Sequence, residues 1–451
     1  MRIVPRTRLI FWAGIILLPF SVLAAAVSSA VAVTAILASG FVVVALIDAM
    51  LVVGRLTDLQ VELPEVVRLT NGREGQISIR IHNQRLGLAR LKLGFAFPRE
   101  IFSPCECLLI ELPKTQADSS VNWPCKALKQ GRYILENSYL KIHSPLGFWG
   151  LQGVKAAKSE LRVFPNLMGE RKNLTGLFLN KGVGVHVQRQ VGKGREFEKL
   201  REYMPGDGFE DIHWKATAKR AQPITKVYQI ERTQEIYIFL DISRLSNRIA
   251  DRPLDSRSPQ DLYTTMMERF TTAALIMCLA AEHQGDLFGV STFDNRVREF
   301  VRAKNGKTHY NTCRDILYNL QPQNVSPDFE EVFTFIGTKL RRRALLIILT
   351  GLDDPELARS FTEHVGLISR RHLILASMIK PDVAKPLFTA DTIDSVDEIY
   401  QHLGGHILWG NLRETEKSLQ RHGVDFALIE NENLCTELVT RYISIKQRQI
   451  L

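Results

Sequence analysis

Residues 235–243 read EIYIFLDIS, an apolar run that ends in a carboxylate. Residues 345–349 read LLIIL, and such a continuously apolar run is typical of a strand buried on both faces of a sheet. Strand-like runs alternate with helix-like runs from here to the end of the chain. The strand-like runs are 235–241, 286–292, 297–303, 344–350, 372–379 and 425–430, and the helix-like runs are 261–283, 308–319, 328–340, 355–369, 394–403, 411–421 and 432–446. The alternation predicts a doubly wound, mostly parallel α/β sheet over residues 235–451.

Asp241 and Ser243 follow the first of these strands. Ligands of doubly wound sheets bind at the carboxyl ends of the strands, so this pair is a candidate site. The order of strand, D-x-S, long helix, strand pair, helix and strand resembles a von Willebrand factor type A domain. That resemblance implies a Mg²⁺ ion held by D-x-S-x-S, a threonine from a second loop and an aspartate from a third.

The expected metal site is incomplete in this sequence. Asp241 and Ser243 match, and Ser326 retains a hydroxyl near the threonine position. Leu245 cannot bind a metal, and Thr350 stands where the third loop should end in an aspartate. Mg²⁺ is therefore one possible cofactor. The alternative is that Asp241 caps the following turn and Ser243 forms a local hydrogen bond.

A second informative stretch, residues 194–227, reads GREFEKLREYMPGDGFEDIHWKATAKRAQPITKV. We call it the signature segment. It resembles the pattern of bacterial membrane proteins that carry "domain of unknown function 58", although His213 and Lys219 depart from that pattern. The matching residues that we take as the signature are Glu196, Phe197, Arg201, Tyr203, Pro205, Gly206, Asp207, Trp214 and Lys215.

The signature segment has two interpretations. Its acid pairs, Glu196 with Glu198 and Asp207 with Asp211, could perform acid–base work on an envelope-associated substrate. Alternatively, it is a salt-bridged segment that packs its aromatic side chains, such as Trp214, between domains. We favour the second interpretation and assign no catalytic residue.

Other catalytic patterns are missing from the sequence. It contains no G-x-S-x-G elbow and no H-E-x-x-H motif. His402 and His406 have a spacing that suits a metal on a helix, but Gly404 and Gly405 between them are expected to break that helix. We therefore predict a protein that is not an enzyme.

The first 56 residues predict a transmembrane hairpin. Residues 9–54 contain one charged residue, Asp48, and are too long for a single span. Two spans fit, near 9–26 and 31–53. The positive-inside rule then predicts a two-pass protein of the bacterial cytoplasmic membrane with both termini in the cytoplasm, because the basic residues lie outside the spans. These residues include Arg2, Arg6, Arg8 and Arg55.

A cleaved signal peptide is the alternative for the first span, although the second apolar run would still anchor the chain. We expect Asp48 to reach the membrane interface or to pair with Arg55.

Short alternating runs separated by proline, glycine and asparagine fill residues 57–165 and predict an immunoglobulin-like β-sandwich. Residues 166–234 form a connector that includes the signature segment. We expect the six cysteines, which form no C-x-x-C motif, to be reduced thiols.

The family resemblance implies a membrane-anchored, cytoplasm-facing adaptor that works with an AAA+ ATPase of the MoxR type. The loops after Asp241, Ser326 and Thr350 are the expected contact surface. A second hypothesis is an enzyme that uses the carboxylates of residues 194–227. A third is a module that binds anionic membrane lipid, based on the net charge of +10. No basic stripe interleaved with aromatic residues is present, so we do not expect nucleic-acid binding.

Overall fold

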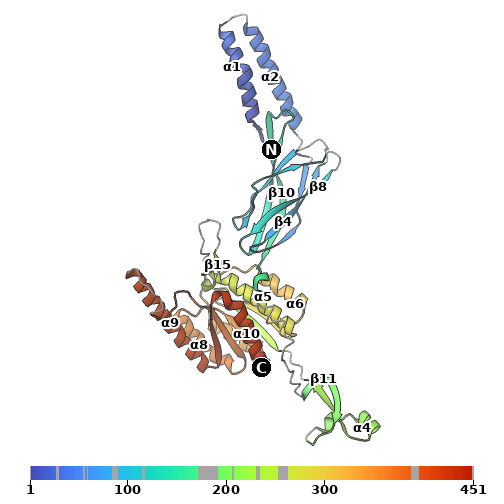
Figure 1. Ribbon diagram of the computed structural model, residues 1–451, viewed down its shortest axis with the longest axis vertical. Coiled ribbons are helices and arrows are strands. Elements are labelled where there is room, and N and C mark those ends of the chain that lie inside the picture. Colours follow the sequence, from blue (N-terminus) through green and yellow to red (C-terminus); the bar gives the residue numbers. More distant parts are fainter. Residues whose placement is uncertain are drawn as a thin grey trace. The chain divides into compact units, whose positions relative to one another are not determined.

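The computed structural model describes residues 2–26, 30–53, 56–57, 59–83, 90–113, 117–170, 191–205, 208–229, 234–251, 263–387 and 396–448. The described residues fall into two compact units, one that runs through Asn166 and one that begins at Leu167. The first unit contains two apolar helices and a set of β-strands, and the second is built around an α/β sheet (Figure 1). The chain is therefore a multidomain protein of mixed α and β structure.

Two apolar helices begin the first unit, α1 (Thr7–Ala26) and α2 (Ala30–Val52). Residues Val31–Val52 are long and apolar enough to cross a membrane, whereas the apolar run Thr7–Val22 is shorter. Large hydrophobic side chains along both helices are exposed, including Phe11 and Met50. Exposed apolar surface of this extent needs an apolar environment.

The sequence did not predict β1 (Arg2–Pro5), a strand that precedes α1. It pairs antiparallel with β10 (Trp149–Phe164), with Arg2 opposite Gln152 and Pro5 opposite Trp149. Because the partner lies about 150 residues away in the sequence, no local pattern reveals this pairing.

The structure gives Asp48 partners that the sequence did not predict. Asp48 is fully buried, and its carboxylate accepts hydrogen bonds from the backbone N–H groups of Leu146 (3.0 Å) and Phe148 (3.3 Å). The indole N–H of Trp149 also donates to the carbonyl of Ala45, at 2.8 Å. These contacts attach α2 to the turn before β10. Arg55, the other expected partner, lies outside the described residues.

Two sheets complete the first unit. One has the order β1-β10-β9-β5-β7, with β3 paired to β10, and the other has the order β2-β4-β8-β6. Their strands are β2 (Leu59–Glu62), β3 (Val66–Thr70), β4 (Glu74–Asn83), β5 (Arg90–Phe95), β6 (Ile101–Phe102), β7 (Leu108–Glu111), β8 (Asp118–Ala127) and β9 (Gly131–His143).

One hydrophobic core joins these two sheets. It takes alternate residues from strands of both, among them Ile79 of β4, Trp123 of β8 and Leu161 of β10. Val52 and Leu56, at the end of α2 and just after it, belong to the same core. The side chains between these buried positions face away from the core, because successive side chains of a strand point to opposite faces of the sheet.

The second unit contains the predicted doubly wound sheet, which is confirmed. The strand order is β17-β16-β13-β18-β19-β20, and β17 at one edge is antiparallel to β16 while the other pairs are parallel. The strands are β13 (Glu235–Asp241), β16 (Leu287–Phe293), β17 (Val297–Lys304), β18 (Leu345–Leu349), β19 (Leu373–Ile379) and β20 (Val424–Ile429).

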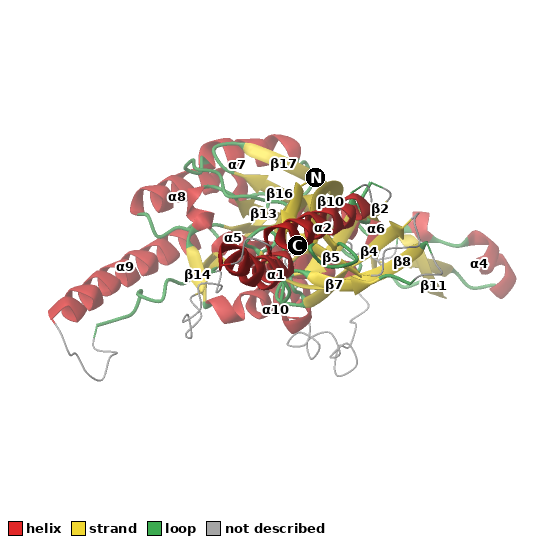
Figure 2. Cartoon of the chain, turned by 90° about the horizontal axis from the view of Figure 1, so that it is seen from above, coloured by secondary structure: helices red, strands yellow, loops and turns green. Residues whose placement is uncertain are grey.

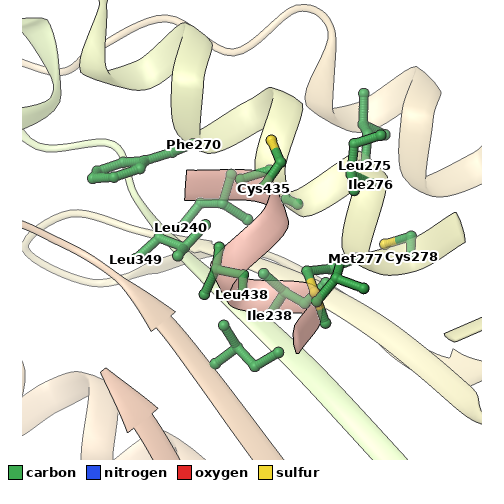
Figure 3. Close-up of a cluster of buried hydrophobic side chains, with 14 of the residues drawn as sticks. Ile238, Leu240, Phe270, Leu275, Ile276, Met277, Cys278, Leu349, Cys435 and Leu438 are labelled. Carbon is green, nitrogen blue, oxygen red and sulfur yellow. The ribbon is translucent and has the colours of Figure 1, made fainter. Parts of the chain in front are cut away.

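Helices cover both faces of this sheet (Figure 2). The helices α5, α6 and α10 pack with Ile238 and Leu240 of β13, as Figure 3 shows for α5 and α10. The helices α7, α8 and α9 pack with Tyr237 and Phe239 on the other face. Their bounds are α5 (Met266–Gln284), α6 (Lys307–Leu317), α7 (Phe329–Lys339), α8 (Pro355–Ser369), α9 (Val396–Arg421) and α10 (Leu434–Gln447). A small pair, β14 (Ile249–Asp251) and β15 (Thr264–Thr265), precedes α5.

The expected break at Gly404 and Gly405 was wrong, because α9 continues through both residues. A Cβ atom at Gly405 would lie 2.0 Å from the carbonyl oxygen of Val383. The glycine therefore lets the chain at Val383 approach the helix directly. Burial of one face of α9 outweighs the low helix propensity of glycine, which costs about 1 kcal/mol.

Candidate functional site

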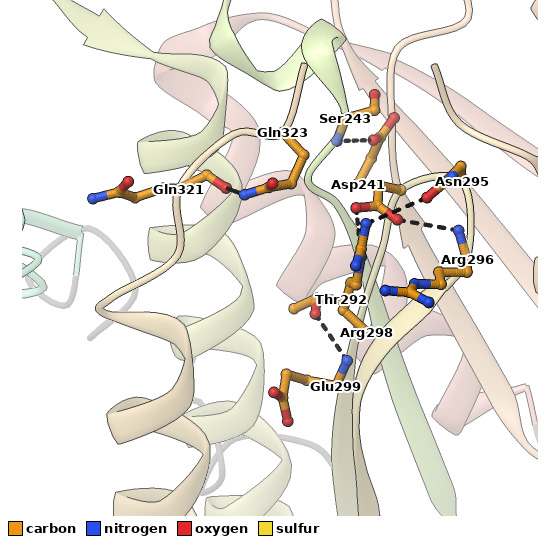
Figure 4. A network of polar contacts seen from close by, with 10 residues as sticks. Asp241, Ser243, Thr292, Asn295, Arg296, Arg298, Glu299, Gln321 and Gln323 are labelled. Carbon is orange, nitrogen blue, oxygen red and sulfur yellow. Dashed lines mark hydrogen bonds and ion pairs between the residues drawn. The ribbon is translucent and has the colours of Figure 1, made fainter. Parts of the chain in front are cut away.

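The candidate metal residues lie at the carboxyl end of the α/β sheet, where Asp241 ends β13. One Asp241 oxygen accepts the backbone N–H of Ser243 at 2.8 Å, and the other accepts the hydroxyl of Thr350 at 2.6 Å (Figure 4 shows the first contact). Ser243 begins the short helix η3 (Arg244–Asn247), and its hydroxyl accepts from the N–H of Leu245 at 3.3 Å. Both oxygens of Asp241 are thus used by protein donors.

Ser326 does not join Asp241 and Ser243. Its hydroxyl accepts a hydrogen bond from Nε of Arg244 at 3.1 Å. Asp353, which follows β18, pairs with Arg248. The loops are held together by hydrogen bonds and ion pairs.

These residues fit a Mg²⁺ shell poorly. Mg²⁺ requires a nearly octahedral set of oxygens at about 2.0–2.1 Å. Asp241 accepts two protein hydrogen bonds, and a cationic side chain bonds the expected hydroxyl of Ser326. Within the described ranges, no group of three or more His, Cys, Asp or Glu side chains could hold a metal ion. Mg²⁺ binding stays a prediction that only a binding experiment tests.

Burial raises the pKa of Asp241 above its usual value. The hydrogen bonds from Ser243 and Thr350 oppose this shift, and the nearby carboxylate of Asp294 adds to it. Asp294 is itself buried and paired with Arg298 at 2.7 Å. The arrangement suits a carboxylate that fixes loops, since both of its oxygens are already engaged.

Sequence reasoning missed the role of Thr350, which it treated as a lost metal ligand. Where the resemblance implies a metal ligand, the Thr350 hydroxyl instead donates a hydrogen bond directly to Asp241. The signal was present in the sequence, because a threonine directly after a buried strand can reach the end of the neighbouring strand.

The signature segment forms a separate two-stranded sheet of β11 (Val191–Glu202) and β12 (Ile224–Gln229). Between these strands lie the short helix η2 (Phe209–Asp211) and α4 (Trp214–Arg220). His213 caps α4, because its Nδ1 accepts the N–H of Ala216 at 3.1 Å. We call the chain between β11 and β12 the insertion. The backbone N–H of His213 donates to the carbonyl of Ile224 at 2.7 Å, which attaches the insertion to β12.

The structure brings several signature residues to this one element. Arg201 and Tyr203 are half-buried, and the Tyr203 ring lies 6.2 Å from that of Phe209. Pro205 and Lys215 are exposed. Only the backbone is described for Glu196 and Phe197, and Gly206 and Asp207 lie outside the described residues.

Large apolar side chains of the insertion are exposed. Phe209 is 76% exposed, Trp214 67% and Met204 60%. Trp214 is therefore not covered within its own unit, and the expectation that it packs between domains stays a prediction. Of the expected acid pairs, Asp211 has a described side chain, which is half-buried, and Glu202 and Glu210 of the same segment are exposed. Acid–base chemistry favours a pocket that perturbs the carboxyl pKa.

The family model described as "Protein of unknown function DUF58" matches residues 199–387. This match spans the end of β11, the insertion and most of the α/β sheet. No curated protein matches the sequence.

Several solved structures are similar to parts of the chain. An aerotolerance-related membrane protein from Bacteroides fragilis NCTC 9343 is 14% identical, with 47% of this chain and 98% of that chain covered and a TM-score of 0.29. BatB from Bacteroides thetaiotaomicron is 13% identical, with coverage of 48% and 99% and a TM-score of 0.28. The SpRpn10 VWA domain is 8% identical, with coverage of 46% and 95% and a TM-score of 0.26. The α/β fold assignment rests on the strand order of this chain itself.

Proposed function

We propose that this member of the DUF58 family, matched over residues 199–387, works as a membrane-anchored, cytoplasm-facing adaptor without catalytic activity of its own. The observation that carries the proposal is the exposure of Met204, Phe209 and Trp214 in the chain that connects β11 to β12.

Two features support insertion of both α1 and α2 into the membrane as a two-pass hairpin. Their outward side chains are apolar, and the strand before α1 pairs with β10, which follows α2 in the same unit. The start of the first helix and the end of the second thus meet one sheet, so they belong on the same side of the membrane. Arg2, Arg6 and Arg8 favour the cytoplasmic side.

The two sheets between the hairpin and Asn166 act in this proposal as an immunoglobulin-like spacer. Their shared core and the bonds of Asp48 to Leu146 and Phe148 make the spacer continuous with α2. A spacer of this kind holds a binding domain near the inner membrane surface.

The β11–β12 sheet has the properties of a docking element. A two-stranded sheet is marginally stable alone and gains stability when a partner covers its apolar side chains. Exposed patches of large apolar residues mark protein interaction sites, and tryptophan is prominent among residues that dominate binding energy. Lys215, Lys219 and Arg220 lie on α4 with Trp214, whereas Glu210 and Asp211 follow Phe209 in η2, so charges of both signs accompany the aromatic residues.

The resemblance to the family suggests an AAA+ ATPase of the MoxR type as the partner. In this proposal, the ATPase contacts Phe209 and Trp214 first, and the carboxyl end of the α/β sheet is a secondary surface. The hydrogen bonding of Asp241 supports that order, because a partner or metal would compete with the donors that each of its oxygens already has.

Capture of the full-length protein from mildly solubilised membranes tests the proposal. Wild type should recover an AAA+ ATPase, and Trp214→Ala should reduce the recovery at least about tenfold, the loss expected for an interface hot spot. Tyr400→Ala is the matched control, because Tyr400 on α9 is 69% exposed and should not matter. Undiminished recovery with Trp214→Ala would show that the docking element is wrong.

A further inference from the structure

A row of basic side chains crosses the outer face of the larger sheet in the first unit. Arg2 pairs with Gln152, Gln152 with Lys141, and Lys141 with Lys92. Residues paired directly across strands project from the same face of a sheet. The neighbours of Lys141 along β9, Leu140 and Ile142, are buried, so the row faces away from the core.

This row has an energetic cost. Like charges directly opposite each other on neighbouring strands destabilise a sheet, and Lys92 lies directly opposite Lys141. In the part of the chain that the structure describes, no ion pair neutralises Arg2, Lys92 or Lys141. A bound anion would remove the repulsion.

The same three residues line a hollow of about 860 Å³. Gly150 adds room beside the row, and a Cβ atom there would lie 3.6 Å from Cε of Lys141 and 3.9 Å from Cγ of Arg6. The side chains of Lys141 and Arg6 thus pass over the same glycine. Glu106 also lines the hollow, so its charge is mixed but mainly positive.

His143, two residues beyond Lys141, is affected by the same positive charge. Its pKa is lowered by burial first and then by Arg6, Lys141 and Lys92. Its Nδ1 atom is buried and has no hydrogen-bond partner among the residues the structure describes. The neutral imidazole therefore retains one unused polar atom beside the row.

The row lies next to the helix that enters the membrane. Arg6 directly precedes α1, and Thr7 is five positions after Arg2, a distance of at most about 17 Å along an extended chain. The cytoplasmic leaflet is rich in anionic lipid, and basic residues held near it gain binding energy from that charge.

We propose that Arg2, Lys92 and Lys141 form a binding site for the phosphate of an anionic phospholipid headgroup, with Arg6 beside it. The site requires the membrane insertion of the proposed function but not the protein partner. This site fixes the first unit against the inner leaflet. The hairpin and the sheet then both attach that unit to the membrane.

Native mass spectrometry of the full-length protein in a non-ionic detergent tests this site without any partner present. The probes are short-chain phosphatidylglycerol, short-chain phosphatidylcholine and inorganic phosphate. The variant is Lys92→Gln with Lys141→Gln. The matched control is Lys158→Gln, at an exposed lysine of the adjacent strand β10 that does not line the hollow.

Phosphatidylglycerol should bind more tightly than phosphatidylcholine, and the double variant should weaken it about 30-fold, as expected from two cations near an anionic group. Lys158→Gln should bind as wild type does. Without lipid, the double variant should melt at the same or a higher temperature, because it removes a repulsive pair. Equal binding of the two lipids, equal binding by the double variant, or binding of inorganic phosphate as tight as that of phosphatidylglycerol would overturn the proposal.

Discussion

The two parts of the DUF58 region use their side chains in opposite ways. At the carboxyl end of the α/β sheet, Ser243 and Thr350 both donate hydrogen bonds to Asp241. Between β11 and β12, Phe209 and Trp214 are exposed. The first region satisfies its own polar groups, whereas the second leaves costly apolar surface uncovered.

This difference indicates where binding energy is available. Polar groups that already have protein partners have less to offer a ligand, because a new contact competes with the existing ones. Exposed aromatic side chains gain free energy when a partner removes them from water. The comparison therefore assigns stability to the first region and recognition to the second.

The largest expected effect is on the stability of the sheet. Asp241→Ala should lower the opening free energy of β13 and β18 by about 2–4 kcal/mol, because it leaves the Thr350 hydroxyl and the Ser243 N–H buried without an acceptor. Hydrogen exchange of peptides from these strands measures the change. Thr350→Val should cost less, since it removes one bond. If the hydrogen exchange of these peptides is the same in Asp241→Ala as in wild type, the hydrogen bonds of Asp241 do not stabilise the sheet, and the contrast between the two regions is wrong.

A pH titration extends the comparison to His372, which is buried at the start of β19. Burial, with Arg371 and Arg343, lowers its pKa from 6.5 to about 4. The unfolded chain then binds the proton more readily, so the stability that His372 contributes is full above pH 6.5 and is lost as the pH falls toward 4. The loss should be at most about 3 kcal/mol.

His372→Leu should remove this part of the pH dependence and leave the exchange of β11 and β12 unchanged. Hydrogen exchange of β19 peptides between pH 6.5 and 4 provides the measurement. If the variant loses stability as steeply as wild type, another group is responsible.

A smaller effect is expected for the exposed region. Trp214→Ala should change the stability of the isolated protein by less than about 0.5 kcal/mol, as surface substitutions usually do. Thermal unfolding of the full-length protein in detergent checks this. A large loss of stability would mean that Trp214 supports the fold and would weaken its assignment to recognition.

The smallest effect concerns the metal. Millimolar Mg²⁺ should leave the exchange of β13 and β18 unchanged, because Asp241 already accepts two hydrogen bonds. Protection that depends on Mg²⁺ in wild type and is lost in Asp241→Asn would instead establish a metal site.

The sequence predicted the α/β sheet well because its strands are buried on both faces. The run at 345–349 and the bounds of α8 could be read from local composition. Features that depend on residues distant in the sequence could not be predicted from local composition. Asp48 accepts hydrogen bonds from residues about 100 positions away.

The candidate site was predicted in part. Asp241 and Ser243 do meet, because they are neighbours in one turn. Ser326 instead accepts a hydrogen bond from Arg244, the exposed residue that follows Ser243. For the signature segment, the pattern identified the residues, but only the structure showed that Trp214 is exposed.

Site-specific photocrosslinking in cells tests the central claim most directly. A photoreactive amino acid placed at position 214 should crosslink to an AAA+ ATPase, whereas the same group at position 326, at the carboxyl end of the sheet, should give little product. A strong product from position 326 and none from position 214 would contradict the account and would return the contact surface to the loops around Asp241.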